Sequence, residues 1–411
     1  MNGLLERFLR YVAVGTQADP ARGVVPSTPG QMTLAKMLEK ELAALGLEDV
    51  RCDEHAYVTG TLPASSSAGK DAPCIGLLAH LDTALDASGE NVKARVIENY
   101  DGGDIPLAPG MTLSPAVFPV LERQKGNTLI VTDGSTLLGG DDKSGIAIIM
   151  TVLEHLTKHP ELPHGPVKVA FAPDEEIAHG CALLDLDAFG ADFAYTIDSM
   201  GMGSLEYETF NAAKAEVVVR GVSVHPGSSK DRMINAILLG MEFVDALPHS
   251  ERPDRTEGYE GFFHVNNFKG AVGETTITMI IRDHDAEKFE ARKALVRDLV
   301  DRLNAAHPST DGPHFTLKIT EQYRNMADKL KDHMHIVETA KQAISEAGIT
   351  PVIEPVRGGT DGAQLSWRGL PTPNLFGGFY NAHGEYEFAS LQDMEASVDV
   401  VLRILQAYGK P

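Results

Sequence analysis

The segment Val167-Lys-Val-Ala-Phe-Ala-Pro-Asp-Glu-Glu176 passes directly from apolar residues into three consecutive acids. Two further apolar runs, Ile75-Gly-Leu-Leu-Ala-His80 and Phe193-Ala-Tyr-Thr-Ile-Asp198, also end in a side chain that can bind a metal ion. Short apolar runs of this kind are typical of buried strands in a parallel sheet. Open α/β sheets bind ligands just beyond the carboxyl ends of such strands. The three runs therefore predict one polar site at the edge of a parallel sheet.

The composition is that of a soluble enzyme with more than one compact unit. The chain has 411 residues, 43% of them hydrophobic and 23% charged, and a chain of this length is expected to form two domains. Its net charge of −22 argues against nucleic-acid and anionic-membrane partners, which are polyanions. The N-terminus lacks a signal-peptide pattern, and the three cysteines have no CxxC spacing. We therefore expect a cytoplasmic protein with no nucleic-acid or membrane partner.

The pattern of elements predicts an α/β fold with a mixed, largely parallel sheet flanked by helices. Apolar spacing predicts a helix over residues 33–46, and the segment 84–136, rich in Gly, Pro and Asp, is expected to form loops with short hairpins. Asp141 is expected to open another helix, since residues 146–156 are apolar and contain no Gly or Pro.

The second half of the chain predicts a smaller inserted domain. Strand patterns lie at residues 215–220, 275–281 and 314–320, and helical patterns lie at residues 235–247 and 285–305. The order β-α-β-β-α-β describes a two-layer, ferredoxin-like α+β domain. We expect a discontinuous catalytic domain at residues 1–208 and 322–411, and an inserted lid and dimerisation domain at residues 209–321. The chain must return to the first domain because His383 is needed at its site.

Five side chains are the candidate metal ligands: His80, Asp141, Glu176, Asp198 and His383. Taken singly, each is more often structural, and acids in a first helical turn also stabilise the helix dipole. As a set, three carboxylates and a hydroxide would balance the charge of two divalent cations, which a buried site requires. Two histidines with carboxylates suit zinc, or another divalent ion such as cobalt or manganese.

Two further acids have predicted roles beside these ligands. Asp82 lies two residues after His80, so on a strand it points the same way and can reach the ring nitrogen that is not on the metal. Adjacent residues diverge in direction, so Glu176 would bind a metal while Glu175 takes a proton from metal-bound water. Glu175 is therefore the predicted general base.

Ten short stretches, in order along nearly the whole chain, carry a family resemblance. They are residues 78–83, 97–105, 132–145, 171–177, 195–198, 224–227, 281–283, 323–326, 357–365 and 381–384. Through them the chain resembles the co-catalytic dizinc metallopeptidases, which include DapE-like desuccinylases and glutamate carboxypeptidases, and among these the tripeptide aminopeptidases. The resemblance implies that His80 and Asp198 hold one zinc, that Glu176 and His383 hold the other, and that Asp141 bridges them.

The resemblance also implies a mechanism and a partner. A bridging hydroxide, formed with Glu175 as base, would attack the scissile carbonyl, and the peptide bond after Asp141 would be cis. His225 in the inserted domain would reach the site of a partner subunit in a homodimer and stabilise the oxyanion. Arg282 and Arg357 are candidate clamps for the peptide's carboxylate, because Arg matches a carboxylate with two parallel hydrogen bonds.

The sequence departs from the family pattern around its last ligand. Ala382 stands where an aromatic residue is usual, and Glu385 and Tyr386 replace a Lys-His pair. These changes affect the expected substrate preference and leave the ligand in place. The predicted function is removal of the N-terminal residue from tripeptides. One alternative is an amidohydrolase or dipeptidase of the same fold acting on N-acyl amino acids or dipeptides, and a remote one is an inactive metal-binding or peptide-binding protein.

Overall fold

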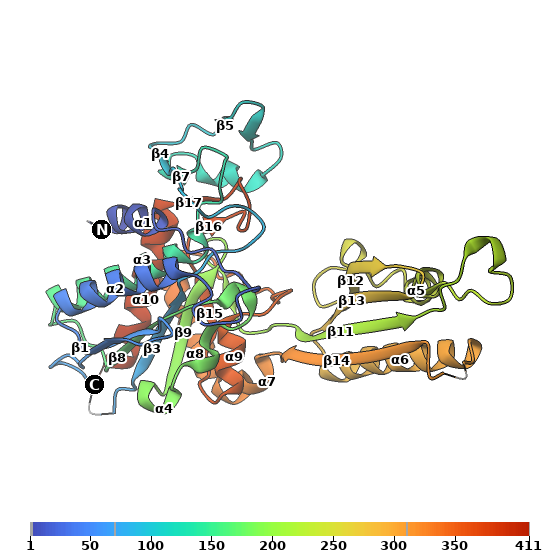
Figure 1. Ribbon diagram of the computed structural model, residues 1–411. Coiled ribbons are helices and arrows are strands. Elements are labelled where there is room, and N and C mark those ends of the chain that lie inside the picture. The colour runs from blue at the N-terminus through green and yellow to red at the C-terminus, as the bar shows by residue number, and fades with distance from the viewer. Residues whose placement is uncertain (1–2, 70, 310, 411) are drawn as a thin grey trace. The chain divides into compact units, whose positions relative to one another are not determined.

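The computed structural model describes residues 3–69, 71–309 and 311–410, and the chain divides into two compact units (Figure 1). The first unit comprises Met1–Tyr207, Asp328–Glu354 and Thr360–Pro411. The second unit comprises Glu208–Ala327 and Pro355–Gly359. The domain ranges expected from the sequence stay a prediction. In this division, residues 322–327 and 355–359 belong to the second unit.

The first unit is built on a seven-stranded mixed sheet, as predicted (Figure 1). In sheet order its strands are β1 (Glu48–Cys52), β2 (Val58–Leu62), β8 (Val167–Ala172), β3 (Ile75–His80), β9 (Phe193–Ser199), β15 (Asn374–Phe376) and β10 (Leu205–Glu206). The four strands from β8 to β15 are parallel, and the outer pairings are antiparallel. Because the central strands run in one direction, their polar carboxyl ends meet at one edge.

Helices cover this sheet and bury its apolar strands. The longer ones are α1 (Leu4–Val12), α2 (Pro29–Ala44), α3 (Gly140–Lys158), α8 (Met334–Glu346) and α10 (Leu391–Gly409), and the short ones are α4 (Leu186–Phe189), α7 (Ala327–Leu330) and α9 (Asp361–Trp367). Helix α3 packs on β3 and β9 and is in turn covered by α1 and α10. Its side chains are buried nearly all round, which matches the apolar run predicted there.

The helix predicted at residues 33–46 begins earlier than expected. Helix α2 starts at Pro29, because a proline at the first helical position has its backbone already set for a helix. The predicted end is confirmed, since Gly46 follows the helix with a φ of 83° that glycine adopts readily. The helix start therefore brings Ser27 and Gln31 into the folded core, where both are fully buried.

A small layer of short strands completes the first unit. A second sheet has the order β16 (Phe379–Tyr380), β17 (Phe388–Ser390), β7 (Leu129–Val131) and β4 (Arg95–Ile97), and β5 (Ile105–Ala108) pairs with β6 (Met111–Leu113). The short hairpin predicted within residues 84–136 is confirmed by the β5–β6 pair. None of the helices in the described ranges combines the length and apolar character that crossing a bilayer requires.

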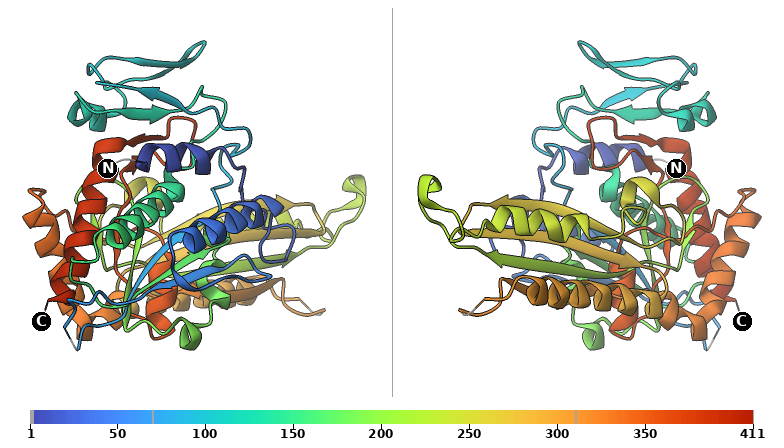
Figure 2. Two further views of the ribbon diagram at one scale, coloured as in Figure 1. Left: turned by 90° about the vertical axis from the view of Figure 1, so that its left-hand side faces the viewer. Right: turned by 90° about the vertical axis from the view of Figure 1, so that its right-hand side faces the viewer.

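The second unit is a four-stranded antiparallel sheet with two helices (Figure 2). In chain order its elements are β11 (Asn211–Arg220), α5 (Ala236–Asp245), β12 (Phe262–Gly270), β13 (Glu274–Asp283), α6 (Ala286–Ala306) and β14 (Phe315–Tyr323). The strands lie in the order β12-β13-β11-β14, and both helices pack on them over one apolar cluster. The predicted order β-α-β-β-α-β is thus observed. Its third element, β12, lies at residues to which no strand was assigned from the sequence, and the dimerisation role stays a prediction.

Candidate metal centre

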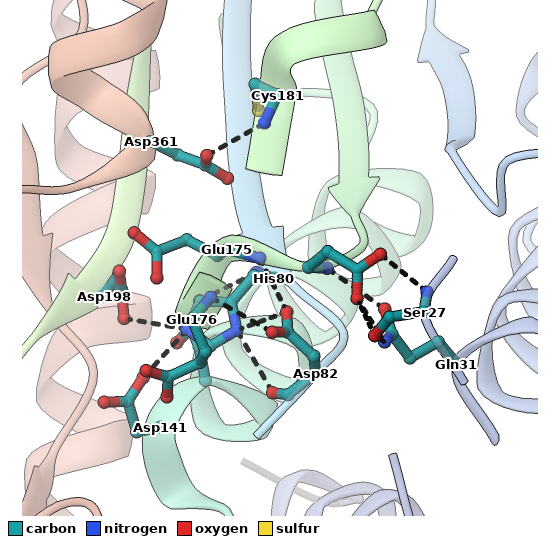
Figure 3. Close-up of polar contacts among 12 residues, drawn as sticks. Ser27, Gln31, His80, Asp82, Asp141, Glu175, Glu176, Cys181, Asp198 and Asp361 are labelled. Atoms are coloured by element: carbon teal, nitrogen blue, oxygen red, sulfur yellow. Dashed lines mark hydrogen bonds and ion pairs between the residues drawn. The ribbon is translucent and has the colours of Figure 1, made fainter. Parts of the chain in front are cut away.

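The five predicted ligands come together in the first unit, although they are far apart in the sequence. Figure 3 shows four of them, His80, Asp141, Glu176 and Asp198. His80 is the last residue of β3, Asp198 lies near the end of β9, and Glu176 lies in the turn that follows β8. Asp141 lies in the first turn of α3, and His383 lies between β16 and β17. Their ligand atoms form two groups that share Asp141, and within each group these atoms lie within 4.8 Å of one another.

The Asp141 carboxylate faces both groups, one oxygen to each. Its Oδ1 lies 2.9 Å from Nε2 of His80, and its Oδ2 lies 3.3 Å from Nε2 of His383. The same nitrogen of His80 lies 3.5 Å from Oδ1 of Asp198, and that of His383 lies 3.2 Å from Oε2 of Glu176. The peptide bond between Asp141 and Asp142 is cis, as the resemblance implies. The arrangement is that of a carboxylate placed between two sets of ligands.

The donor set fits a pair of divalent cations. Donors held at about 2.0–2.1 Å in a tetrahedral zinc site lie about 3.3 Å apart. The separations of 3.2 and 3.5 Å between histidine nitrogens and the carboxylates of Glu176 and Asp198 are close to this spacing. Oε1 of Glu176 is also buried and has no hydrogen-bond partner among the described residues. A buried carboxylate oxygen without a partner is costly, and a cation would stabilise it.

In the absence of cations, burial and charge shift the pKa values of this group. Burial disfavours the charged form of His80, but attraction by Asp198 and a hydrogen bond with Asp141 outweigh it and raise the His80 pKa well above its usual range. Hydrogen bonds with Asp141 and Glu176 raise the pKa of His383 to about 11. Burial raises the pKa of Asp198 well above that of an ordinary carboxyl. Protons therefore compete with cations for the imidazoles of His80 and His383 and for the carboxyl group of Asp198.

Cation binding is expected to release protons and to strengthen as the pH rises. Both imidazoles must lose their protons to bind a metal, and burial raises the pKa of Glu176, so this carboxyl also competes. Each proton released makes the apparent affinity rise about tenfold per pH unit. Calorimetric titration of Zn²⁺ into metal-free protein, in buffers of different ionisation enthalpy between about pH 6 and 8, measures this. An affinity that stays constant over that range, without proton release, would refute it.

Asp82 connects His80 to the acidic turn after β8. Its backbone carbonyl lies 3.2 Å, and its Oδ1 3.3 Å, from Nδ1 of His80, the ring nitrogen that faces away from Asp141. The same carboxylate accepts the backbone N–H groups of Glu175 at 3.0 Å and Glu176 at 3.1 Å. Asp82 is completely buried. Asp82 therefore orients a histidine through its carbonyl and its side chain, and its side chain fixes the main chain of the two glutamates.

Glu175 is placed beside the ligands without being part of either group. Burial raises its pKa well above the usual value, and the nearby charges of Asp361 and Asp198 act in the same direction. In Figure 3 the side chain of Glu175 extends toward Asp198. A carboxylate with a raised pKa beside a metal centre is suited to accept a proton and return it.

Glu387 was not predicted, yet its carboxylate organises the loop that carries Asp141. It is buried and accepts three backbone N–H groups, from Leu138 at 2.7 Å, Gly139 at 2.8 Å and Asp141 at 3.0 Å. A Cβ at Gly140 would lie 3.0 Å from this carboxylate, so glycine provides the space. The signal in the sequence was an acid directly before the apolar strand β17.

Three predicted residues belong to the second unit and are described within it. His225 is exposed, and its Nδ1 accepts the N–H of Gly227 at 3.1 Å, so Nε2 carries the proton of the neutral ring. Arg282 is buried, donates to the carbonyl of Ala213 at 3.3 Å and lies over the ring of Tyr323. These contacts lie inside the unit.

Arg357 has a similar internal environment in the second unit. Its Nη1 donates to the carbonyls of Gly258 at 2.8 Å and Glu260 at 2.9 Å, and its Nη2 donates to Oγ1 of Thr256 at 2.8 Å. The guanidinium also lies over the ring of Phe210. The substrate-clamp roles of both arginines stay predictions.

The chain is similar to known proteins over nearly its whole length. The sequence matches peptidase family M20/M25/M40 over residues 133–407. It is 52% identical to Peptidase T of Desulfitobacterium hafniense, across 100% of this chain and 99% of that protein. It shares the fold of the aminopeptidase PepT from Bacillus cereus, with a TM-score of 0.77 at 23% identity over 99% of this chain and 98% of that one.

A more distant structure has the same fold. The YXEP protein of Bacillus subtilis, described as a dinuclear metal binding peptidase, has a TM-score of 0.64 at 12% identity, over 99% of this chain and 97% of that one. The expected resemblance to the tripeptide aminopeptidase group is confirmed by relatives named Peptidase T at about half identity over the full chain. This chain is a member of peptidase family M20/M25/M40.

Proposed function

We propose that this protein is an aminopeptidase that releases the N-terminal residue of tripeptides at a site holding two zinc ions. The relatives named Peptidase T support the substrate class. The observation that carries the metal assignment is the Asp141 carboxylate, whose two oxygens face two different histidines. In this proposal His80 and Asp198 bind one cation, Glu176 and His383 bind the other, and Asp141 binds both.

The residues of this chain would divide the work of peptide hydrolysis. Two cations held by these ligands would supply Lewis acidity for the scissile carbonyl and for the attacking water. Glu175 takes a proton from that water and delivers it to the departing amine, and its raised pKa supports both transfers. Asp82 holds His80 in the tautomer whose Nε2 is the metal ligand. His225, with its proton on Nε2, would donate a hydrogen bond to the developing oxyanion in the site of a partner subunit.

A panel of peptides tests the substrate class. We expect release of the N-terminal residue from tripeptides to be much faster than from dipeptides or tetrapeptides. N-acetylated tripeptides should not be cleaved, because an aminopeptidase recognises the free amine. Preferential cleavage of the N-acetylated substrates would instead support an amidohydrolase, and cleavage of dipeptides alone would support a dipeptidase.

The second unit is proposed to pair two copies of the chain. On α5, Leu238 is 61% exposed and Met241 is 56% exposed, and Phe268 on the edge strand β12 is 39% exposed. Exposed apolar side chains beside an open sheet edge are typical of interfaces. Light scattering is expected to give twice the mass of one chain. The mass of a single chain at micromolar concentration would contradict both the dimer and the role given to His225.

The cysteines support a cytoplasmic location. Cys52, Cys74 and Cys181 are all free, as expected in a reducing compartment. Cell fractionation that recovered the protein outside the cytoplasm would contradict this location.

A further inference from the structure

The acidic turn after β8 begins at a residue that has no part in the proposed chemistry. Asp174 precedes Glu175 and Glu176, and its side chain is completely buried. Its φ is 58°, a left-handed conformation that few residues other than glycine adopt. Its carbonyl accepts the N–H groups of His179 at 3.0 Å and Gly180 at 2.9 Å, which closes the turn. The conformation at Asp174 therefore sets the direction of the chain through both glutamates.

The Asp174 carboxylate is held by Ser27, just before α2, and by Gln31, in the first turn of α2. Figure 3 shows Ser27 and Gln31 side by side. Ser27 donates its backbone N–H at 2.7 Å and its hydroxyl at 2.5 Å. Gln31 donates its amide at 2.6 Å, and its amide oxygen accepts the backbone N–H of Asp174 at 3.1 Å. Gln31 thus binds the main chain and the side chain of the same residue, which fixes both.

A second buried carboxylate holds the turn from the β3 side. Asp82 accepts the N–H groups of Glu175 and Glu176, as described above. Asp82 therefore fixes the peptide groups on either side of Glu175, and Ser27 and Gln31 independently fix the residue before it. With the backbone held, the Glu175 carboxylate can move only by rotation about its side-chain bonds. A catalytic group that must be placed precisely needs this kind of support.

We propose that Ser27 and Gln31 are positioning residues for the reaction. They act through Asp174, and they fix the backbone from which Glu175 reaches the attacking water. This inference rests on the proposed function, because it assigns to Glu175 the proton transfer described there. It predicts that loss of the clamp lowers kcat and leaves substrate binding nearly unchanged.

The test is Gln31→Met, which keeps the length of the side chain and removes both of its hydrogen-bonding groups. The matched control is Gln124→Met. Gln124 is also buried in the first unit, donates to Asp393 at 2.9 Å and accepts from Asn127 at 2.9 Å. The Gln31 side chain makes four hydrogen bonds, two with Asp174 and one each with Ser27 and Thr28, whereas the Gln124 side chain makes two. Both variants remove the hydrogen bonds of a buried glutamine, but only Gln31 contacts the acidic turn.

We expect Gln31→Met to lower kcat on the order of 10- to 100-fold, with KM changed by less than about twofold and the cation content unchanged. In the metal-free protein, hydrogen exchange of the amides in residues 174–180 should become at least about tenfold faster. Gln124→Met should leave kcat and this exchange unchanged. If Gln31→Met does not fold, Ser27→Ala, which retains the backbone N–H bond to Asp174, should show the same pattern with a smaller loss.

Two results would overturn the inference. One is a Gln31→Met protein with unaltered kcat and unaltered exchange in the turn. The other is an equal loss of kcat in the Gln124→Met control, which would indicate general destabilisation. If Gln31→Met leaves kcat and hydrogen exchange unchanged while Glu175→Gln is inactive, only the positioning role is refuted. A fully active Glu175→Gln variant would show that another group transfers the proton, and the base role of Glu175 in the proposed function would then fail together with the positioning role.

Discussion

Glu175→Gln is expected to bind its cations normally and to hydrolyse tripeptides about 100- to 10,000-fold more slowly than the unaltered protein. The amide has nearly the shape of the carboxylate but cannot take a proton from water. Glu175 belongs to neither ligand group, so the metal content should stay the same. The measurement is kcat for tripeptide release beside elemental analysis of the same sample.

The control for this variant is Glu122→Gln, which makes the same substitution at an exposed position. It should retain full activity and full metal content. Normal tripeptide turnover by Glu175→Gln would show that another group transfers the proton. Loss of metal together with activity would show that Glu175 is needed for the centre itself and would leave its role as base without support.

Asp141→Asn is expected to weaken cation binding by at least about 100-fold and to abolish peptide release. Removal of groups that merely support a ligand costs 10- to 100-fold in affinity, so loss of a shared ligand should cost at least as much. An amide offers one oxygen where Asp141 offers two, and it removes a negative charge that offsets the cations. Competition with a chelator of known affinity measures the loss for each cation.

The matched control is Asp187→Asn, on an exposed turn of α4, which should bind cations normally. Because Asp141 is shared, both cations should be affected. Loss of only one cation, with the other bound at full affinity, would contradict the bridging role. It would place Asp141 in a single-ion site.

The parts of the site that follow from strand direction could be predicted from the sequence. His80 and Asp198 lie at the ends of parallel strands, and Glu176 lies in the turn after the third such strand, so the sheet itself brings them together. Asp141 could be placed because an apolar helix follows it directly. His383 had no such pattern, and its assignment rested on the complete set of ligands and on the family resemblance.

The supports of the site could not be predicted, for a physical reason. Glu387 and Asp174 act through hydrogen bonds between side chains and backbone groups of distant segments, which leave no periodic pattern. An acid in a turn has the same sequence signature whether it is solvated or buried. Gln31 was further hidden because the helix start was predicted four residues too late, at Thr33 in place of Pro29.

The most direct measurement is anomalous diffraction at the zinc edge from crystals of the zinc-loaded protein. The account predicts two peaks in each subunit. One should lie among His80, Asp141 and Asp198, and the other among Asp141, Glu176 and His383. A single peak, or peaks away from these five side chains, would contradict the account.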